Sequence, residues 1–157
     1  MLTVRQASAL DIELVVPLFD AYRQFYGQTP DLALARAFLS ERFAHHESIV
    51  LLATKSSVAV GFTQLYPSFS SVSAARTYLL NDLFVQPQHR RSGVAKLLIT
   101  EAVRHARALG AIRLTLSTAH TNVSAQKLYE SLGWKLDEQF RSYVLTMKDA
   151  AEHSHVR

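Results

Sequence analysis

The stretch QHRRSGVAKLLI, from Gln88 to Ile99, constrains the fold of this chain more than any other, because an extended apolar run gives way there to a helical one. Before it, TYLLNDLFV is rich in residues that favour strands, and Pro87 ends that run. After it, apolar residues recur at helical spacing as far as Leu109, and Gly110 stands where a helix commonly ends. The chain must therefore form a strand, a tight loop and a helix in direct succession.

The loop within this stretch places positively charged side chains next to the amino end of a helix, which is itself partially positive. Arg90 and Arg91 stand at the entrance of the expected helix, whose amino end bears partial positive charge from its unpaired N–H groups. Gly93 has no Cβ, so the backbone there can approach a ligand closely. A pyrophosphate suits such a loop. The ATP and dinucleotide motifs GxxxxGK[ST] and GxGxxG are absent from the sequence and do not account for it.

Two helices are expected early in the chain, after a short strand around residues 2–5. Ser8 and Asp11 form a capping box that starts the first helix, which runs to Gly27 and which Pro17 should kink or divide. The second helix begins at Asp31 and ends before a loop at residues 45–47. Both carry apolar residues at helical spacing and should pack against the core.

Extended runs make up the middle of the chain. SIVLLAT and VAVGFTQLY flank a polar turn at residues 55–57 and predict an antiparallel hairpin, which the serine-rich loop SFSSVS follows. In TYLLNDLFV, Asn81 and Asp82 interrupt an otherwise apolar strand, which favours a β-bulge or a functional site.

Three further elements are expected near the end of the chain: a strand at residues 112–117, a helix at 123–132 capped by Gly133, and a final strand at YVLTM, residues 143–147. A frayed tail should begin at about residue 149. The order βααβββαβαβ predicts a single mixed α/β domain over residues 1–157.

Charge and composition exclude several classes of function. The formal net charge of +4 is modest and the basic residues are scattered apart from residues 89–91, which suits a small anion and supplies no nucleic-acid-binding motif. The sequence has no cysteine, which removes thiolate chemistry and suits a reducing compartment, and it has no HExxH, so no metal site is expected. It also lacks a bilayer-spanning apolar run, and MLTVRQAS does not have a signal-peptide layout, so we expect a cytoplasmic protein without a membrane partner.

Two motifs stand in an order typical of one enzyme superfamily. The first is R-x-x-G-x-A, from Arg90 through Gly93 to Ala95, and the second is TNVSAQKLYESLGW, which matches N-x-x-A-x-x-L-Y-x-x-x-G-[FW] beyond one helix and one strand. The chain therefore resembles the GCN5-related N-acetyltransferase (GNAT) superfamily over nearly its whole length. The resemblance implies a sheet that splays open between its fourth and fifth strands and admits acetyl-CoA.

The resemblance also implies a cofactor site, carried over residue by residue. Backbone N–H groups of the loop would hold the pyrophosphate, Arg90 would supply charge, and the strand before the loop would offer backbone groups to the pantetheine arm. Asn122 would contact the cofactor through its side-chain amide, and Lys127 would reach a phosphate. The implied cofactor residues are Leu83, Phe84, Val85, Arg90, Arg91, Ser92, Gly93, Val94, Ala95, Asn122 and Lys127.

Two residues are candidates for catalysis. Tyr129 occupies the position where relatives have the general acid, near the sulfur of CoA, and its alternative role is a core tyrosine. Asp82 is the only carboxylate beside the expected acetyl position; it either acts as the base through water, orients the ammonium group of the amine, or is structural. Polyamine acetyltransferases that look similar have YLEDLFV where this chain has YLLNDLFV, so Asn81 stands in place of their glutamate. The N–H of Leu83 or a neighbour would polarise the acetyl carbonyl.

The acceptor pocket is expected between the first helices, the serine-rich loop and the final strand. Aromatic rings beside Asp82 suit a cationic amine, whereas Arg23, if it points inward, favours a carboxylate or phosphate on the acceptor. The predicted substrate-binding residues are Tyr22, Tyr26 and Asn81, with Arg23, Phe25, Gln64 and Tyr66 as further candidates.

These features predict an N-acetyltransferase that transfers the acetyl group of acetyl-CoA, by direct attack, to a primary amine of a small molecule such as a polyamine, an amino acid or an amino sugar. A lysine or amino-terminal amine of a protein is the alternative acceptor. The alternative classes are a non-catalytic acyl-CoA-binding module and, weakest of all, a basic domain that contacts nucleic acid through residues 89–91. A homodimer paired through terminal strands is also expected.

Overall fold

The structure is a computed structural model that describes residues 1–149. The chain divides into two compact units, Met1–Ser117 and Thr118–Arg157. The first contains a five-stranded sheet with helices on both faces, and the second contains α4 (Val123–Ser131). The predicted mixed α/β fold is confirmed, whereas the single domain over residues 1–157 stays a prediction.

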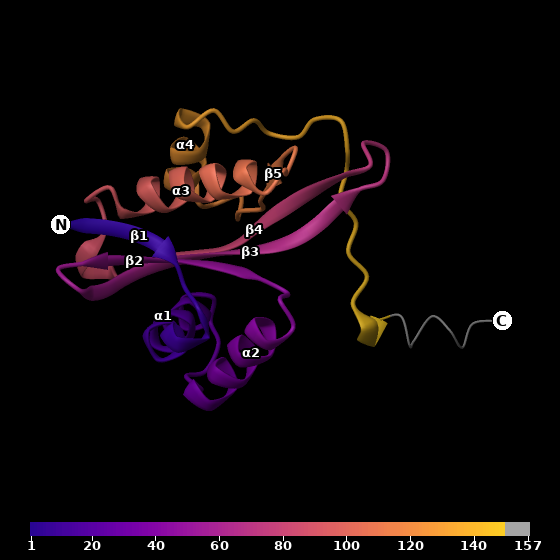
Figure 1. Ribbon diagram of the computed structural model, residues 1–157. Helices are drawn as coiled ribbons and strands as arrows, with labels where there is room; N and C mark the ends of the chain where they lie inside the picture. The colour runs from indigo at the N-terminus through magenta and orange to yellow at the C-terminus, as the bar shows by residue number, and fades with distance from the viewer. Residues whose placement is uncertain (150–157) are drawn as a thin grey trace. The chain divides into compact units, whose positions relative to one another are not determined.

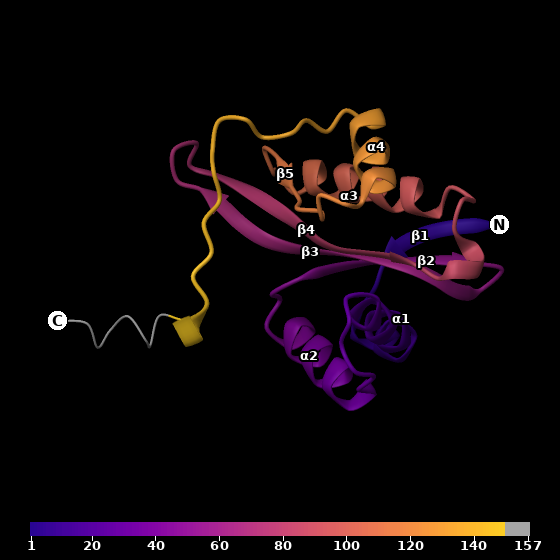
Figure 2. The same ribbon diagram turned by 180° about the vertical axis from the view of Figure 1, so that it is seen from behind.

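The sheet of the first unit has its strands in sequence order, and only its last pair is parallel. Helices α1 and α2 cover one face of this sheet and α3 covers the other, as Figure 1 shows and Figure 2 shows from behind. Short 3-10 turns at Ala9–Asp11 and Pro87–His89 precede α1 and α3. The strands are β1 (Leu2–Gln6), β2 (Ile49–Lys55), β3 (Val58–Ser70), β4 (Ala75–Val85) and β5 (Leu114–Thr115), and the helices are α1 (Ile12–Phe25), α2 (Leu32–Ala44) and α3 (Val94–Ala108).

Both early helices start where the capping pattern predicts. The Ser8 and Asp11 capping box is present, and the side chain of Asp31 accepts a hydrogen bond from the N–H of Leu34 at 3.0 Å at the start of α2. α1 continues through Pro17, so the prediction that this residue divides the helix is wrong. The hydrogen bond that proline removes would have gone to Glu13 in the first turn of the helix, so only one bond near the helix start is lost.

The predicted hairpin of β2 and β3 is confirmed, with Ser56 and Ser57 both in the left-handed conformation that a two-residue turn requires. β3 then runs further than expected, through Pro67 to Ser70, so the first half of the predicted loop SFSSVS is strand. β2 pairs with β3 only as far as Leu65. Beyond that point β3 is an edge on the β2 side, where proline's missing N–H costs no ladder bond.

β4 has a bulge and then an open side. Gln64 lies opposite Asp82 and Leu65 lies opposite Leu80, so Asn81 is the extra residue and the predicted bulge is confirmed. On the other side of β4, β5 pairs only with Tyr78 and Leu79. From Leu80 to Val85, no strand among residues 1–149 pairs with that side of β4. The sheet therefore opens between β4 and β5, as the resemblance implies.

Two strands expected late in the chain are short or absent. The strand predicted at residues 112–117 is reduced to Leu114–Thr115. The predicted strand YVLTM is wrong, because residues 143–146 form no strand and Met147 begins a helical turn. The apolar side chains of YVLTM are exposed, and no strand within the described residues pairs with this segment. Nearly all of the predicted tail, residues 150–157, lies outside the described residues.

No helix in the part of the chain that the structure describes is long and apolar enough to cross a membrane.

Gly61 allows β3 to lie close to the main chain of β4. A Cβ built on Gly61 would lie 2.7 Å from the carbonyl oxygen of Phe84 and 3.4 Å from Cδ1 of Leu98 on α3. The first distance is shorter than a carbon and a backbone oxygen tolerate, so any side chain forces the strands apart just before the loop.

Gly61→Ala is therefore expected to lower the free energy of unfolding by about 1–3 kcal/mol, the usual range for overpacking. Val58→Ala, at an exposed position of the same strand, should change it by less than about 0.5 kcal/mol. Urea unfolding followed by circular dichroism measures both. Equal stability of the two variants would show that β3 and β4 do not require this close approach.

Candidate functional site

Asp82 is a buried carboxylate at the bulge of β4, with 1% of its surface exposed. Oδ1 accepts a hydrogen bond from Nδ2 of Asn81 at 2.7 Å, and Oδ2 accepts one from Nε2 of Gln64 at 2.5 Å. Burial raises the pKa of the Asp82 carboxyl, and hydrogen bonds from Asn81, Gln64 and Tyr22 offset only part of that rise. In this first unit no lysine, arginine or histidine forms an ion pair with it.

The bulge brings Asn81 and Asp82 side by side. In a regular strand, consecutive side chains point to opposite faces of the sheet. The extra residue interrupts that alternation, and the 2.7 Å bond joins the two side chains on one side. Asn81 is exposed while Asp82 is buried, so only Asn81 reaches the surface.

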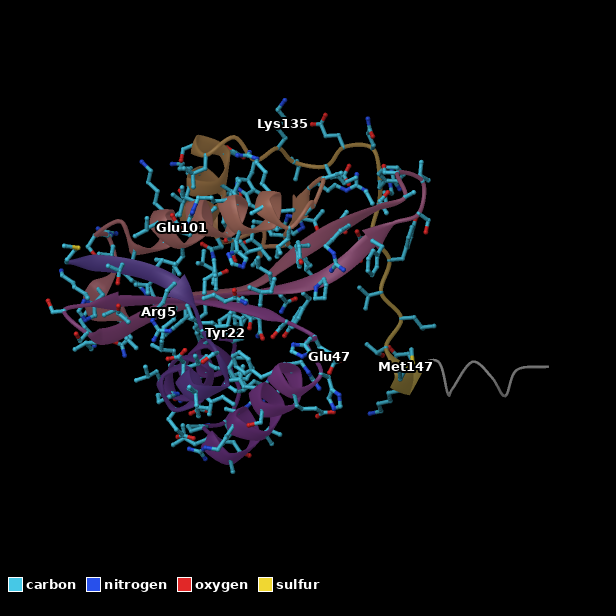
Figure 3. All side chains as sticks on the ribbon, in the orientation of Figure 1. Arg5, Tyr22, Glu47, Glu101, Lys135 and Met147 are labelled. Carbon is cyan, nitrogen blue, oxygen red and sulfur yellow. The ribbon has the colours of Figure 1, made fainter. Side chains whose placement is uncertain are left out.

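Tyr22 lies in the last turn of α1, and Figure 3 shows its label between this helix and the sheet. Its hydroxyl donates a hydrogen bond to the main-chain oxygen of Asn81 at 3.3 Å. Its ring packs edge-on against Phe62 and Tyr26, with centroids 5.9 Å and 5.1 Å away. Burial, and then the negative charge of Asp82, raise the pKa of the Tyr22 phenol, so it stays neutral.

Tyr66 on β3 shares this environment. Burial and the charge of Asp82 raise the pKa of its phenol, against the opposing charge of Arg42 on α2. Arg42 in turn lies over the ring of Phe38, 4.5 Å from its centroid, and pairs with Glu41 and Glu47.

Two buried polar atoms of the predicted acceptor residues have no hydrogen-bond partner among residues 1–149: Oε1 of Gln64 and Nη1 of Arg23. Gln64 turns its amide N–H toward Asp82, which leaves its oxygen without a donor. An unpaired buried polar atom costs about 1–3 kcal/mol. Both atoms would therefore gain from a bond to water or to a ligand.

The loop before α3 leaves consecutive backbone N–H groups free. From Arg91 to Lys96, no described residue accepts a hydrogen bond from these N–H groups. Arg91 and Gly93 have φ of 58° and 84°, and left-handed residues within such a loop turn successive N–H groups toward one side. No acidic residue occurs between positions 86 and 99. The predicted pyrophosphate loop thus has the geometry of an anion-binding site.

Arg90 ties this loop to the end of β4. Its Nε donates to the main-chain oxygen of Val85 at 2.9 Å, and its guanidinium carbon lies 5.6 Å from the ring centroids of both Phe25 and Phe84. The side chain remains exposed. Arg90 therefore fixes the loop against the strand whose side opens after Leu79.

The second unit contains the other predicted cofactor and catalytic residues. Oδ1 of Asn122 accepts a hydrogen bond from the N–H of Ala125 at 3.3 Å, so Asn122 caps α4. Lys127 is exposed on the helix, and Tyr129 is half-buried.

The end of α4 holds Tyr129 in place through a Schellman motif. The N–H of Trp134 donates to the oxygen of Tyr129 at 3.0 Å, and the N–H of Gly133 donates to that of Glu130 at 3.1 Å. Gly133 has the left-handed φ of 91° that this motif requires. The rings of Tyr129 and Trp134 lie 6.0 Å apart, which is the apolar contact that accompanies such caps.

The structure thus brings Tyr22, Gln64, Asn81 and Asp82 into one cluster, with Tyr26 against Tyr22. The bond between Gln64 and Asp82 was not predicted, because the register that sets them opposite each other depends on the bulge. In the described part of the chain, no group of three or more His, Asp or Glu side chains is placed to hold a metal ion.

Comparison with known proteins gives consistent matches. The model of the acetyltransferase (GNAT) family matches residues 15–134. An uncharacterized N-acetyltransferase of Bacillus subtilis, YhfO, is 46% identical over 93% of this chain and 98% of its own length. A probable acetyltransferase of Haemophilus influenzae is 32% identical over 90% of this chain and 96% of its own length. The crystal structure of a probable acetyltransferase, 40% identical, matches with a TM-score of 0.89 over 92% of this chain and 97% of that one.

Asp82→Asn is expected to gain stability over the wild type as the pH rises. The Asp82 carboxyl has a higher pKa in the folded chain than its ordinary value of 3.8, which applies to the unfolded chain. The wild type's free energy of unfolding therefore falls as the pH rises from 3.8 through the raised pKa of the folded chain. Asparagine carries no charge to bury, and its amide can donate to Oε1 of Gln64.

Urea unfolding of both proteins near pH 4 and near pH 8 measures this difference. The expected result is a stability gap that widens in favour of the variant at the higher pH. A gap that stays constant would show that Asp82 has the same pKa in both states.

Proposed function

Because the chain belongs to the acetyltransferase (GNAT) family, we propose that it transfers the acetyl group of acetyl-CoA to a primary amine of a small molecule. The observation that carries this proposal is the run of free backbone N–H groups from Arg91 to Lys96 beside the open side of β4. When bound, acetyl-CoA supplies an acetyl group activated as a thioester.

The loop before α3 fits the diphosphate of such a donor. Its N–H groups from Arg91 to Lys96 have no acceptor among the described residues, the helix adds partial positive charge, and Arg91 and Lys96 add full charges with no acidic residue between positions 86 and 99. We assign Arg91 to Ala95 to the pyrophosphate, with Arg90 holding the loop against β4.

The open side of β4 suits an extended arm. Leu83, Phe84 and Val85 lie where β4 has β3 on one side and no described strand on the other. Apart from the oxygen of Val85, which accepts a hydrogen bond from Arg90, main-chain groups on such an edge are available to bond a pantetheine arm, as a strand would. The N–H of Leu83 is our candidate for polarising the acetyl carbonyl.

We assign the second unit to the donor and to the leaving group. Asn122 uses its oxygen as a helix cap, so its amide nitrogen is the group left to contact the cofactor, and Lys127 is exposed for a phosphate. Tyr129 is the proposed general acid, which gives its phenolic proton to the sulfur as the C–S bond breaks. The Schellman motif and Trp134 would keep that phenol in one orientation.

The acceptor is assigned from the cluster at the bulge. Tyr22 bonds to the main chain of Asn81 and packs against Tyr26, and the exposed side chain of Asn81 lies at this place, which suits a small amine. A buried, unpaired Nη1 on Arg23 favours an acceptor that also carries an acidic group, such as an amino acid. L-ornithine N5-acetyltransferase NATA1 of Arabidopsis thaliana, 32% identical over 57% of this chain, is a relative named for such an acceptor.

Thiol release from acetyl-CoA tests the proposal, with polyamines, amino acids, amino sugars and peptides with free amino termini as acceptors. Mass spectrometry of the product identifies the modified nitrogen. Acetylation of at least one small amine supports the proposal. Release only with peptides, or with no acceptor, would contradict it.

A homodimer and a cytoplasmic location belong to the same proposal. Leu136, Phe140, Tyr143 and Val144 expose large apolar side chains, a surface of the kind that a second copy covers.

Gly93→Ala is expected to weaken CoA binding about fivefold, since alanine costs about 1 kcal/mol in the left-handed conformation and a loop that relaxes turns its N–H groups away. Gly110→Ala is a matched control, because Gly110 at the other end of α3 has φ of 82° and equally open surroundings. Both variants should lose similar stability. Calorimetric titration with CoA should then show weaker binding for Gly93→Ala alone; equal affinity of both variants would contradict the assignment of the loop.

Tyr129→Phe should lower kcat about 100-fold, because the sulfur then leaves without its proton donor, while the Kd for acetyl-CoA stays within about twofold. Tyr143→Phe, an exposed tyrosine of the same unit, should leave kcat unchanged. Steady-state rates and titration calorimetry separate the two effects. An undiminished kcat in Tyr129→Phe would exclude the phenol as the acid.

A further inference from the structure

We propose that Asn81 binds the acceptor amine in its neutral form through its side-chain oxygen, and that Asp82 and Gln64 are positioning residues that orient the Asn81 amide. This inference rests on the proposed function and assigns the residue that the amine contacts. It also implies that the protein prefers amines of lower pKa, which are partly neutral at working pH.

The burial of Asp82 argues against direct contact with the amine. The side chain is 1% exposed, and each of its two oxygens already accepts a hydrogen bond from an amide, 2.7 Å from Asn81 and 2.5 Å from Gln64. A group that takes a proton from a substrate must lie within hydrogen-bond reach of it. At this bulge the exposed neighbour, Asn81, has that access.

The charge of Asp82 sets which way the Asn81 amide faces. An ionised carboxylate only accepts hydrogen bonds, so both neighbouring amides must turn their N–H groups toward it. Asn81 therefore directs its nitrogen inward, and its oxygen is left for another donor. Tyr22 restrains the main chain at the same residue by its bond to the Asn81 carbonyl.

Gln64 bonds to Asp82 through its amide nitrogen, and its own amide oxygen stays unpaired within the described part of the chain. Its Nε2 bonds to Asp82, and its buried Oε1 has no partner among residues 1–149. A glutamine that only filled space would gain by pairing both ends. The arrangement instead fixes the second oxygen of Asp82, which leaves the first one for Asn81.

Within Met1–Ser117, no other group linked to the bulge can take the proton of an ammonium ion at neutral pH. The phenols are weak bases, and the pKa values of Tyr22 and Tyr66 are raised further by burial and by Asp82. Arginine stays protonated, and a carboxamide does not accept a proton. Within Met1–Ser117 the ionisable groups linked to the bulge directly or through one neighbour are Asp82, Tyr22, Tyr26, Tyr66, Arg42 and Arg90.

In this proposal the amine loses its ammonium proton to water before it binds. Its nitrogen donates one N–H to Oδ1 of Asn81 and forms the bond to the acetyl carbon as the C–S bond breaks. The nitrogen then releases a second proton to water, and the sulfur takes its proton from the proposed acid. Amines that are partly neutral at working pH, such as α-amino groups with a pKa near 8, are favoured over alkylamines with a pKa near 10.

Profiles of kcat/KM against pH test this with two acceptors, an α-amino amide and a primary alkylamine of similar size. The rate for each amine should rise with pH up to that amine's own pKa, and near pH 7 the two should differ by about 100-fold, as their neutral fractions do. A rise that levels off at one pH for both amines would place a base on the protein and overturn the inference alone. No acetylation of any small amine in the thiol-release assay would overturn the proposed function and the inference with it.

Three variants test the roles of the residues. Asn81→Ala should raise the KM for the amine about tenfold and leave the Kd for acetyl-CoA unchanged. Asp82→Ala should do the same, because the Asn81 amide loses its anchor. Asp82→Asn keeps an oxygen for Asn81 and supplies a donor for Gln64, so it should restore kcat/KM to within about threefold of the wild type. A loss of about 100-fold or more in both Asp82 variants would identify Asp82 as the base and overturn the inference.

Discussion

The one extra residue in β4 determines the chemistry of this site. It sets Gln64 opposite Asp82 and Leu65 opposite Leu80, and it turns Asn81 to the same side as Asp82. Without it, Asn81 would point to the other face of the sheet, and a buried carboxylate would stand beside apolar strand residues with a single amide partner. The bulge thus allows a carboxylate to lie inside the sheet layer while the neutral amide of Asn81 is exposed, and we propose that this amide binds the acceptor.

The proposed acetyl-CoA site depends on a different feature, the main-chain groups that stay unpaired within the described residues along one side of β4 and at the start of α3. β5 stops pairing with β4 after Leu79, and α3 begins after a loop whose N–H groups from Arg91 onward have no acceptor in the described chain. Both features expose main-chain groups where a protein interior normally satisfies them. Gly61 keeps β3 close to β4 at this point, and Arg90 joins the loop to Val85, so the two open edges stay adjacent.

Local chemistry predicted most of the fold. The capping box at Ser8, the turn at Ser56 and Ser57, and the punctuation by Pro87 and Gly93 each depend on a few neighbouring residues, and each is found where expected. The wrong predictions fall where pairing with a strand distant in the sequence determines the local structure. Pro67 is accommodated because β2 no longer pairs with β3 there, and YVLTM has the composition of a strand but no neighbour within residues 1–149. Likewise the polar interruption at Asn81 and Asp82 marked the site, but their partner Gln64 follows only from strand register.

The position of the acceptor nitrogen in a crystal of the protein with CoA and a bound amine tests the central claim most directly. The account places that nitrogen about 2.7–3.2 Å from Oδ1 of Asn81, with both oxygens of Asp82 still bonded to the two amides. An amine nitrogen bonded to an oxygen of Asp82, with the Asn81 side chain turned away, would contradict it.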